Sequence, residues 1–351
     1  MNRHDRRKKT KLIYEKDLET RGLCGKFDVI GLGMSCVDCI LKVESVENLN
    51  RVSVFDWTIQ GGGKASTAMV AAARLGAKTS VITRIGQDEA GELVISEFKK
   101  YGVDTSRIIV QEGYSTPILF ILVDANGSPR WIDAKVLKDW VLPEPVRRMV
   151  KLAEAKNQFE NTVTRKNSED ELDFVTEGRI LLLDCFQPEC LDAAIAARKN
   201  NVETCLDMYF HPNLTDLLRN ITYCIPSRRA AADFTGETDP EAMCRKLLSL
   251  GPEVVGVTLG EEGSVFMTKK GELVKQKAFR VQVVDTTGAG DVFHGAFCYG
   301  VAQGWSLPRI VEFSSAVAAL KCRRLGGRAG IPSLDEAEEF LRKFKQSINI
   351  T

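Results

Sequence analysis

The chain has 351 residues, of which 44% are hydrophobic and 27% charged, and its 48 basic and 47 acidic residues leave a formal net charge of +1. So small a net charge produces no overall field that would attract nucleic acid or an anionic membrane, and we expect neither as a partner. No apolar run approaches the roughly 18 to 20 residues that span a bilayer. The ten cysteines are dispersed, mostly in apolar contexts, which is typical of reduced thiols in the cytoplasm rather than of a disulfide framework.

The first half of the chain alternates between strand and helix patterns. A β-rich apolar run over residues 27–41, broken by glycines, predicts the first strand, and residues 51–59 predict exposed strand. Three glycines then precede a helix over residues 64–75, a buried strand over 79–86 and a second helix over 89–101. Strand, helix and strand at this spacing indicate a parallel sheet covered by helices on both faces.

A β-hairpin is predicted within residues 116–133. Two β-rich runs flank Asn126 and Gly127, the dipeptide that most strongly favours a tight hairpin turn. We expect this hairpin to join the strands near residues 40–60 in a small sheet outside the main layers. That sheet is interpreted as a lid, with segments at about 38–60 and 112–133.

The second half contains a charged helical insertion at about residues 143–173, after which α/β alternation resumes. Its last two predicted helices cover residues 291–303 and 307–322. The predicted fold class is α/β: a doubly wound, mainly parallel sheet with helices on both faces and a small β-sheet lid. It forms one domain over residues 26–345, preceded by a basic N-terminal tail at 1–25 that lacks the apolar stretch of a secretory signal.

The most informative stretch is VVDTTGAGDVFHGAFCYGVAQG, residues 283–304. Gly288, Ala289 and Gly290 lie where a strand turns into a helix, so their backbone N–H groups and the positive end of the helix dipole can together form an anion hole. Asp291 follows in the first helical turn. A carboxylate beside such a hole can accept a proton from a hydroxyl while the hole stabilises a transferring phosphoryl group. Geometry alone leaves a second role open, because an aspartate after a glycine turn is also a common helix N-cap.

Two stretches about 200 residues apart carry a family resemblance. DTTGAGDVFHGAF resembles the C-terminal signature of the ribokinase-like (PfkB) carbohydrate kinases, and GGGKASTAMVAAARLGAKTSVITRIGQDEAGE, residues 61–92, resembles their N-terminal signature. The similarity extends in order through about residues 26–342. It implies a ribokinase-like fold, an ATP-dependent sugar kinase, and ATP and Mg²⁺ as cofactors.

The resemblance also assigns roles to single residues around the glycine turn. Asp291 corresponds to the family's catalytic base, and the residues at 288–290 correspond to its anion hole. Asp285 and Thr287 lie where family members often hold a monovalent cation, which makes K⁺ a possible further ligand. His294, one helical turn after Asp291, is interpreted as a packing residue rather than a proton-transfer group.

Sugar-binding residues are expected near the N-terminal signature. Asp38 occupies the place of a family aspartate that binds sugar hydroxyls, a task that suits a carboxylate because it accepts two hydrogen bonds at once. Gly62 and Gly63 resemble the turn that lets the backbone approach the sugar. Ser66 replaces an asparagine usual in that signature, so hydrogen bonding to the substrate differs here.

The nucleotide is expected beside VTLGEEG, residues 257–263. Thr258, Gly260 and Gly263 are candidates for contact with ATP, and Ala319 is a candidate for flanking the adenine, although a small-residue helix packed on the sheet explains it equally well. Pro226–Ala230 lacks both the asparagine and the glutamate of the family's Asn-x-x-Glu motif, so the way in which Mg²⁺ is held differs here.

The substrate class is suggested by the closest branch of the family. The three glycines before Lys64, the altered Asn-x-x-Glu region and ALKCRRLGGRAGIP at 319–332 most resemble the branch containing sulfofructose kinase, with fructokinase-like members next. A ketose-type sugar or its acidic derivative is therefore expected. Arg51 and Lys64 are candidates to bind an anionic substituent, although an ordinary surface charge is the preferred interpretation of each, and Glu112 argues against committing to a sulfonated sugar.

Three other functions compete with the sugar-kinase interpretation. A nucleoside kinase of the same fold would need a lid residue such as Trp131 or Tyr114 to stack a base. A catalytically weak sugar- or nucleotide-binding regulator would explain the missing Asn-x-x-Glu motif. A dinucleotide-binding protein is rejected because GLGMSC lacks the third glycine of the fingerprint. Exposed edge strands of the lid make a homodimer plausible.

Overall fold

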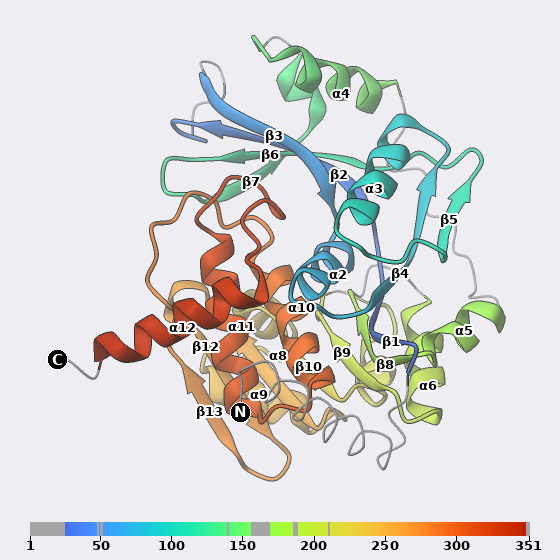
Figure 1. Ribbon diagram of the computed structural model, residues 1–351, viewed down its shortest axis with the longest axis vertical. Helices are drawn as coiled ribbons and strands as arrows, with labels where there is room; N and C mark the ends of the chain where they lie inside the picture. The colour runs from blue at the N-terminus through green and yellow to red at the C-terminus, as the bar shows by residue number, and fades with distance from the viewer. Residues whose placement is uncertain are drawn as a thin grey trace, which may run out of the picture.

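The computed structural model describes residues 25–47, 49, 52–138, 140–155, 169–184, 189–209 and 211–348. Nearly all of the basic tail, Arg51 and the middle of the charged insertion lie outside these residues. The described chain forms two sheets, a large one surrounded by helices and a small one at one end of the molecule (Figure 1).

The large sheet has the strand order β13-β12-β11-β10-β9-β8-β1-β4-β5. The strands from β11 to β5 in this order pair in parallel, and β12 and β13 continue the sheet in antiparallel pairing. This is the α/β class that the alternating pattern predicts. The strands are β1 Phe27–Leu32, β4 Thr79–Gly86, β5 Ile108–Gln111, β8 Gly178–Leu183, β9 Glu203–Leu206, β10 Tyr223–Cys224, β11 Val254–Thr258, β12 Ser264–Thr268 and β13 Leu273–Gln276.

The small sheet has the order β3-β2-β6-β7. Its strands are β2 Cys36–Val43, β3 Val54–Gly62, β6 Ile118–Val123 and β7 Pro129–Ile132. The antiparallel pair of β6 and β7 surrounds Asn126 and Gly127, where φ is 81° at the glycine, so the predicted hairpin is present.

The expectation of a single strand over residues 27–41 is wrong. The run is divided between β1 of the large sheet and β2 of the small sheet. The break occurs because the Met34 N–H donates to the Asp184 carboxylate (3.0 Å) instead of to a neighbouring strand. Pairing resumes in the other sheet, where the Val37 N–H donates to the Pro117 carbonyl (2.9 Å). This segment therefore connects the two sheets directly beside the candidate site.

Helices cover both faces of the large sheet (Figure 1). Those of the first half are α2 Lys64–Arg74, α3 Glu89–Lys100, the 3₁₀ turn η1 Ala134–Leu137, α4 Glu144–Glu154 and α5 Glu169–Val175. Those of the second half are α6 Cys190–Lys199, α7 Leu214–Leu218, α8 Arg228–Thr235, α9 Pro240–Leu248, the 3₁₀ turn η2 Gly260–Glu262, α10 Ala289–Ala302, α11 Leu307–Lys321 and α12 Leu334–Ile348. Among the described helices, none is both long and apolar enough to cross a bilayer.

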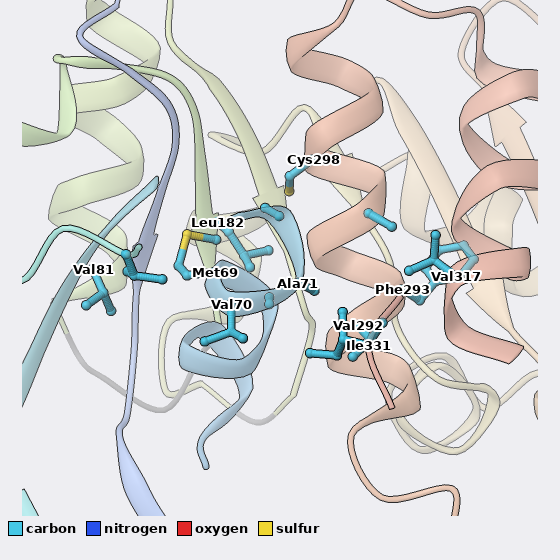
Figure 2. Packing of buried hydrophobic residues seen from close by; sticks show 14 of the residues in the cluster. Met69, Val70, Ala71, Val81, Leu182, Val292, Phe293, Cys298, Val317 and Ile331 are labelled. Atoms are coloured by element: carbon cyan, nitrogen blue, oxygen red, sulfur yellow. The ribbon is translucent and has the colours of Figure 1, made fainter. Parts of the chain in front are cut away.

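Helices α2 and α10 pack against each other in the centre of the core (Figure 2). Met69 and Val70 of α2 and Val292 and Phe293 of α10 are all buried there. Gly295 makes the close approach possible, because a Cβ at this position would lie 2.2 Å from the Ala68 carbonyl oxygen. This packing fixes α10, whose first turn carries the candidate base.

Candidate active site

Two aspartates come directly after neighbouring parallel strands. Asp184 follows β8 and Asp207 follows β9, and both side chains are buried. Because the carboxyl ends of parallel strands meet at one edge of a sheet, the two carboxylates lie at the same edge. Such an edge is the usual place for a ligand in a doubly wound fold.

Lys64, the first residue of α2, joins this group of carboxylates. Its ammonium lies 3.1 Å from the Asp207 carboxylate, and its side chain is 30% exposed. Burial lowers the pKa of Lys64, but the charges of Asp207 and Asp291 raise it by more, so the net pKa is above the ordinary lysine value. The preferred interpretation of Lys64 as an ordinary surface charge is therefore wrong, since α2 begins at the site.

The first turn of α10 presents backbone and carboxylate together. Gly288 is the N-cap with φ of 72°, a left-handed conformation that favours glycine. A Cβ built on Gly290 would have no heavy atom within 4 Å apart from its own helical turn, so the helix terminus faces open space at this residue. Asp291 follows and is half-buried. The N-terminal N–H groups of a helix beside open space are suited to binding an anion.

Burial and neighbouring charges make Asp291 a stronger base than an exposed aspartate. Its pKa is raised to about 7, chiefly because burial disfavours the charged form and secondly because the Asp207 charge is near. Lys64 opposes this effect, while Asp38 and Asp184 add to it. A carboxylate with a pKa near neutrality can accept a proton and release it again at physiological pH.

Asp38 lies on β2, in the small sheet, and faces the same site. Its side chain is 7% exposed and accepts a hydrogen bond from the Cys36 thiol at 3.3 Å. Burial raises the pKa of Asp38 to about 6. A Cβ at Gly62 would lie 2.2 Å from the Asp38 carboxylate, so glycine is required there for the carboxylate to keep this position. The small sheet thus contributes an acidic group opposite the one on α10.

Gly63 and Ser66 shape the start of α2. Gly63 has φ of 95°, and a Cβ there would lie 2.1 Å from the Met34 carbonyl oxygen. The buried Ser66 hydroxyl donates to that carbonyl at 3.0 Å and contacts the Ser35 hydroxyl at 2.6 Å. Because its proton is used within the protein, direct donation from Ser66 to a sugar stays a prediction that this geometry does not favour.

Arg328 was not singled out from the sequence, yet it lies beneath the small sheet. Its side chain is 1% exposed, with Nη2 donating to the Gly62 carbonyl at 3.2 Å and Nε to the Thr67 hydroxyl at 3.4 Å. Its charge is among the causes that lower the pKa of Asp38 against burial. The RAG sequence that contains it was a signal available from the sequence, but its position relative to Asp38 was not.

Comparison with known proteins agrees with this geometry. The pfkB family carbohydrate kinases match residues 26–334, which is most of the chain. The chain belongs to this family. It is therefore an ATP-dependent carbohydrate kinase, a phosphotransferase.

The kinase is similar to curated relatives over nearly their whole length. It is 31% identical to a ribokinase of Haemophilus influenzae over 294 residues, which is 82% of this chain and 89% of the relative. It is 24% identical to a 5-dehydro-2-deoxygluconokinase of Halalkalibacterium halodurans, covering 91% of this chain and 95% of the relative. Among solved structures, a ribokinase from Thermotoga maritima aligns with a TM-score of 0.68 at 25% identity, covering 90% of this chain and 99% of that one. An Arabidopsis thaliana ribokinase complexed with ribose and ATP shares the fold, with a TM-score of 0.72 at 23% identity over 90% of this chain and 99% of that one.

The predicted nucleotide contacts of the kinase fall in two environments. Thr258 ends β11, and its N–H donates to the Pro226 carbonyl at 3.0 Å. Gly260 faces open space, whereas a Cβ at Gly263 would lie 1.9 Å from the Gln276 carbonyl oxygen. Gly263 therefore closes the β11–β12 turn, and Gly260 is the more accessible of the two. Ala319 is half-buried near the end of α11.

Two further residues of the kinase take structural roles. Arg228 forms a two-pronged ion pair with Glu262, each contact at 2.7 Å, which ties α8 to η2. The ring nitrogens of His294 lie 2.7 Å from the Gly290 carbonyl and 3.0 Å from the Ile225 carbonyl. His294 therefore links the first turn of α10 to the large sheet, in agreement with a packing role.

Asp285 and Thr287 form the turn that leads into α10. The buried Asp285 carboxylate accepts hydrogen bonds from the Thr287 N–H at 2.8 Å and the Gly326 N–H at 2.7 Å. The backbone carbonyls of Asp285 and Thr287 both accept from the Lys321 ammonium. The resemblance assigns this turn to a free monovalent cation, but two of its carbonyls already contact a charged side chain. Within the described chain, no group of three or more metal-binding side chains is found.

Proposed function

We propose that the kinase transfers the γ-phosphate of ATP to a hydroxyl of a ketose-type sugar or of an acidic sugar derivative, with Asp291 as the general base. The observation that carries this proposal is the half-buried Asp291 carboxylate, with its pKa near 7, in the helical turn whose Gly290 faces open space. Such a group can take the hydroxyl proton as the oxygen attacks phosphorus.

The phosphate side of the reaction uses backbone and lysine. The N–H groups of residues 288–290 bind the phosphoryl oxygens as negative charge develops on them, as helix N-termini do for anions. Lys64 lies close enough to Asp291 to affect its pKa and adds a positive charge on the same side, next to Asp207.

Magnesium enters this account as part of the nucleotide substrate. The lack of a three-ligand side-chain cluster among the described residues fits an ion held mainly by ATP phosphates and water, as is usual for Mg²⁺. Asp184 and Asp207 directly follow β8 and β9. Their carboxylates are oxygen donors of the kind that Mg²⁺ prefers, and they would accept hydrogen bonds from the water molecules bound to the ion. When bound, Mg²⁺ neutralises charge on the phosphates.

The substrate class rests on Asp38 and on the relatives. As a carboxylate, Asp38 can accept hydrogen bonds from two hydroxyls of one sugar. Relatives matched over most of the chain carry names of kinases for a dehydro-deoxygluconate, for ribose and for fructose 6-phosphate. The ribokinase is the more similar of these relatives, at 31% identity against 24% and 23% for the other two, so these names include ketose-type substrates without favouring them over an aldose. The sulfofructose-type substrate of the most similar branch stays a prediction.

The register of the small sheet sets the distance from Asp38 to Trp131, a residue that could stack a nucleoside base. Asp38 pairs with Leu119 of β6, whereas the exposed Trp131 of β7 pairs with Ile121. Trp131 is therefore two residues and two strands from Asp38, about 12 Å between Cα atoms for ordinary strand spacings. That separation is within the combined length of a nucleoside and the two side chains, so the substrate screen below decides between a sugar and a nucleoside.

The small sheet is proposed to act as a lid. It contributes Asp38 while α10 contributes Asp291, so movement of the sheet changes the distance between the two carboxylates and excludes water when it closes. We place the reaction in the cytoplasm, where ATP is available. Dimerisation through the edge strands β3 and β7 stays a prediction. The exposed side chain of Phe55 on β3, at 66%, is an apolar group that such an interface would bury.

The test is a phosphorylation screen over ketohexoses, sulfosugars, keto-deoxy acids, sugar phosphates, aldopentoses and nucleosides. The proposal predicts that one ketose or acidic derivative has the highest kcat/KM, and that Asp38→Asn raises its KM by about tenfold or more. Asp56→Asn, on the exposed part of β3, is the matched control and should leave KM unchanged. Faster turnover of a nucleoside than of every sugar, or ATP hydrolysis with no phosphorylated sugar, would overturn it.

A further inference from the structure

The ammonium of Lys321 is enclosed within the protein beneath the turn at residues 285–287, which leads into α10. Lys321 is the last residue of α11 and has an exposure of 0%. Its Nζ donates to the Asp285 carbonyl at 2.9 Å and to the Thr287 carbonyl. A lysine buried to this degree is rare in proteins unless its charge is compensated, so this contact requires a reason.

Compensation comes from carbonyl dipoles and from one nearby carboxylate. Burial lowers the pKa of Lys321, and the charge of Asp285 offsets this effect only in part. The Asp285 carboxylate itself is bound by the N–H groups of Thr287 and Gly326, so the lysine binds the backbone of the turn rather than forming a direct ion pair. The turn therefore presents two convergent carbonyl oxygens and a buried negative charge to a single cation.

Convergent backbone carbonyls are also the ligands that proteins use for K⁺. A free ion at this turn would need the same two oxygens that the Lys321 ammonium contacts. The donor set left by Lys321 does not fit a second cation, because two like charges would then share one buried site.

We propose that the Lys321 ammonium is a tethered replacement for a free monovalent cation, and that the kinase neither binds nor needs K⁺ at this turn. This revises the sequence-based assignment of K⁺ to Asp285 and Thr287. The two residues keep the role of organising the turn before α10, and the cation that holds them is covalently part of α11. The turn is then independent of the ionic composition of its surroundings.

The inference predicts how the wild-type kinase responds to salt. Thermal unfolding and turnover are measured in KCl, NaCl and choline chloride at equal ionic strength, up to about 100 mM, so that specific binding is separated from screening. The expected result is the same melting temperature and the same kcat in all three salts. A melting temperature or kcat that rises with K⁺ in a saturable way would overturn the proposal.

Removal of the ammonium should create a cation site. In Lys321→Ala, a space lined by the two carbonyls replaces the side chain, so the variant should melt at a lower temperature in choline chloride and recover by roughly 2 °C or more in KCl. Lys321→Met fills the same space without a charge and should be destabilised with no recovery in KCl. Equal responses of the two variants to K⁺ would contradict the proposal.

Lys42 offers a matched control on β2. Its half-buried Nζ also donates to two backbone carbonyls, those of Asp124 and Val284, the second at 2.9 Å. Lys42→Ala opens to solvent and should show no preference for K⁺ over choline. The melting readout needs no sugar, so its outcome is separate from that of the substrate screen. If Lys321→Ala does not fold, the wild-type titration alone decides.

Discussion

Asp291 shows how one environment makes a base and at the same time costs stability. Its pKa of about 7 is above the ordinary aspartate value of 3.8 because burial penalises the charged form. Burying the ionised carboxylate therefore costs free energy, and accepting a proton removes that cost. If Asp291 is the proposed base, its raised pKa should appear in the pH dependence of both rate and stability.

The rate of sugar phosphorylation should follow the ionisation of Asp291. The base works only when deprotonated, so kcat/KM of the wild type should fall by about tenfold per pH unit below a midpoint near the pKa of about 7. The residual rate of Asp291→Asn should lack this limb. A wild-type profile that stays flat down to about pH 5 would show that another group limits the rate.

Lys64 should set the position of that midpoint. Its positive charge lowers the pKa of Asp291 against burial, so Lys64→Met should move the acidic limb of the kcat/KM profile to higher pH. A loss of sugar or ATP affinity alone would lower kcat/KM at every pH but would leave the midpoint unchanged, so the position of the midpoint separates the two effects. Arg229, exposed on α8, provides the control: Arg229→Met should leave the midpoint unchanged. A midpoint that moves to lower pH in Lys64→Met would contradict the arrangement.

The stability of Asp291→Asn should depend on pH in a defined direction. In the wild type, the folded pKa lies above the unfolded one, so the folded protein loses stability as pH rises from about 4 to about 7 and carries the full cost above that range. Asn has no charge to bury. The variant should therefore have a larger free energy of unfolding than the wild type at about pH 8, by ~1 kcal/mol or more, and no advantage at about pH 4. Denaturant unfolding at the two pH values checks this, and equal differences would contradict it.

At the scale of elements, α10 separates the requirements of folding from those of function. Its first turn is open at Gly290, where the phosphoryl group is proposed to bind, and its middle is closed at Gly295 for contact with α2. Two glycines on one helix thus have opposite reasons for lacking a side chain.

Paired substitutions test this division. Gly290→Ala adds a methyl group where no protein atom outside its own helical turn lies within 4 Å, so it should keep or slightly raise the melting temperature while lowering kcat/KM by about tenfold or more. Gly295→Ala places a Cβ 2.2 Å from the Ala68 carbonyl and should lower the melting temperature. If Gly290→Ala were fully active, the proposed phosphate position would be wrong.

The elements themselves were largely predictable from the sequence, because each depends on a local pattern. The helix after Gly63 has apolar spacing and small residues, and the hairpin at Asn126 and Gly127 has a turn signal that depends on backbone conformation alone. The division of residues 27–41 between two sheets was not predictable. It depends on Asp184, about 150 residues away, which accepts the Met34 N–H.

At the scale of the whole molecule, the site is a meeting of segments that are far apart in the chain. Asp291 and Asp38 were predicted as site residues because motifs mark them, and the structure brings them close enough for the charge of Asp38 to raise the pKa of Asp291. Asp207, Arg328 and Lys321 were missed because nothing next to them in the sequence indicates what they contact. Their roles follow only once β9, the loop after α11 and α11 itself are placed around the site.

Closure of the small sheet is a prediction about the whole molecule. Binding of the preferred sugar with a non-hydrolysable ATP analogue should reduce amide hydrogen exchange in β2 and β3 and leave β12 and β13 unchanged. Protection that is equal in both sheets would indicate general stabilisation instead of lid closure.

The central claim is that the carboxylate of Asp291 takes the hydroxyl proton, and single-turnover phosphoryl transfer by Asp291→Asn tests it most directly. With the preferred sugar and ATP both saturating, the variant is predicted to transfer phosphate about 10³-fold more slowly than the wild type while binding ATP with unchanged affinity. Transfer within about tenfold of the wild-type rate would contradict the claim.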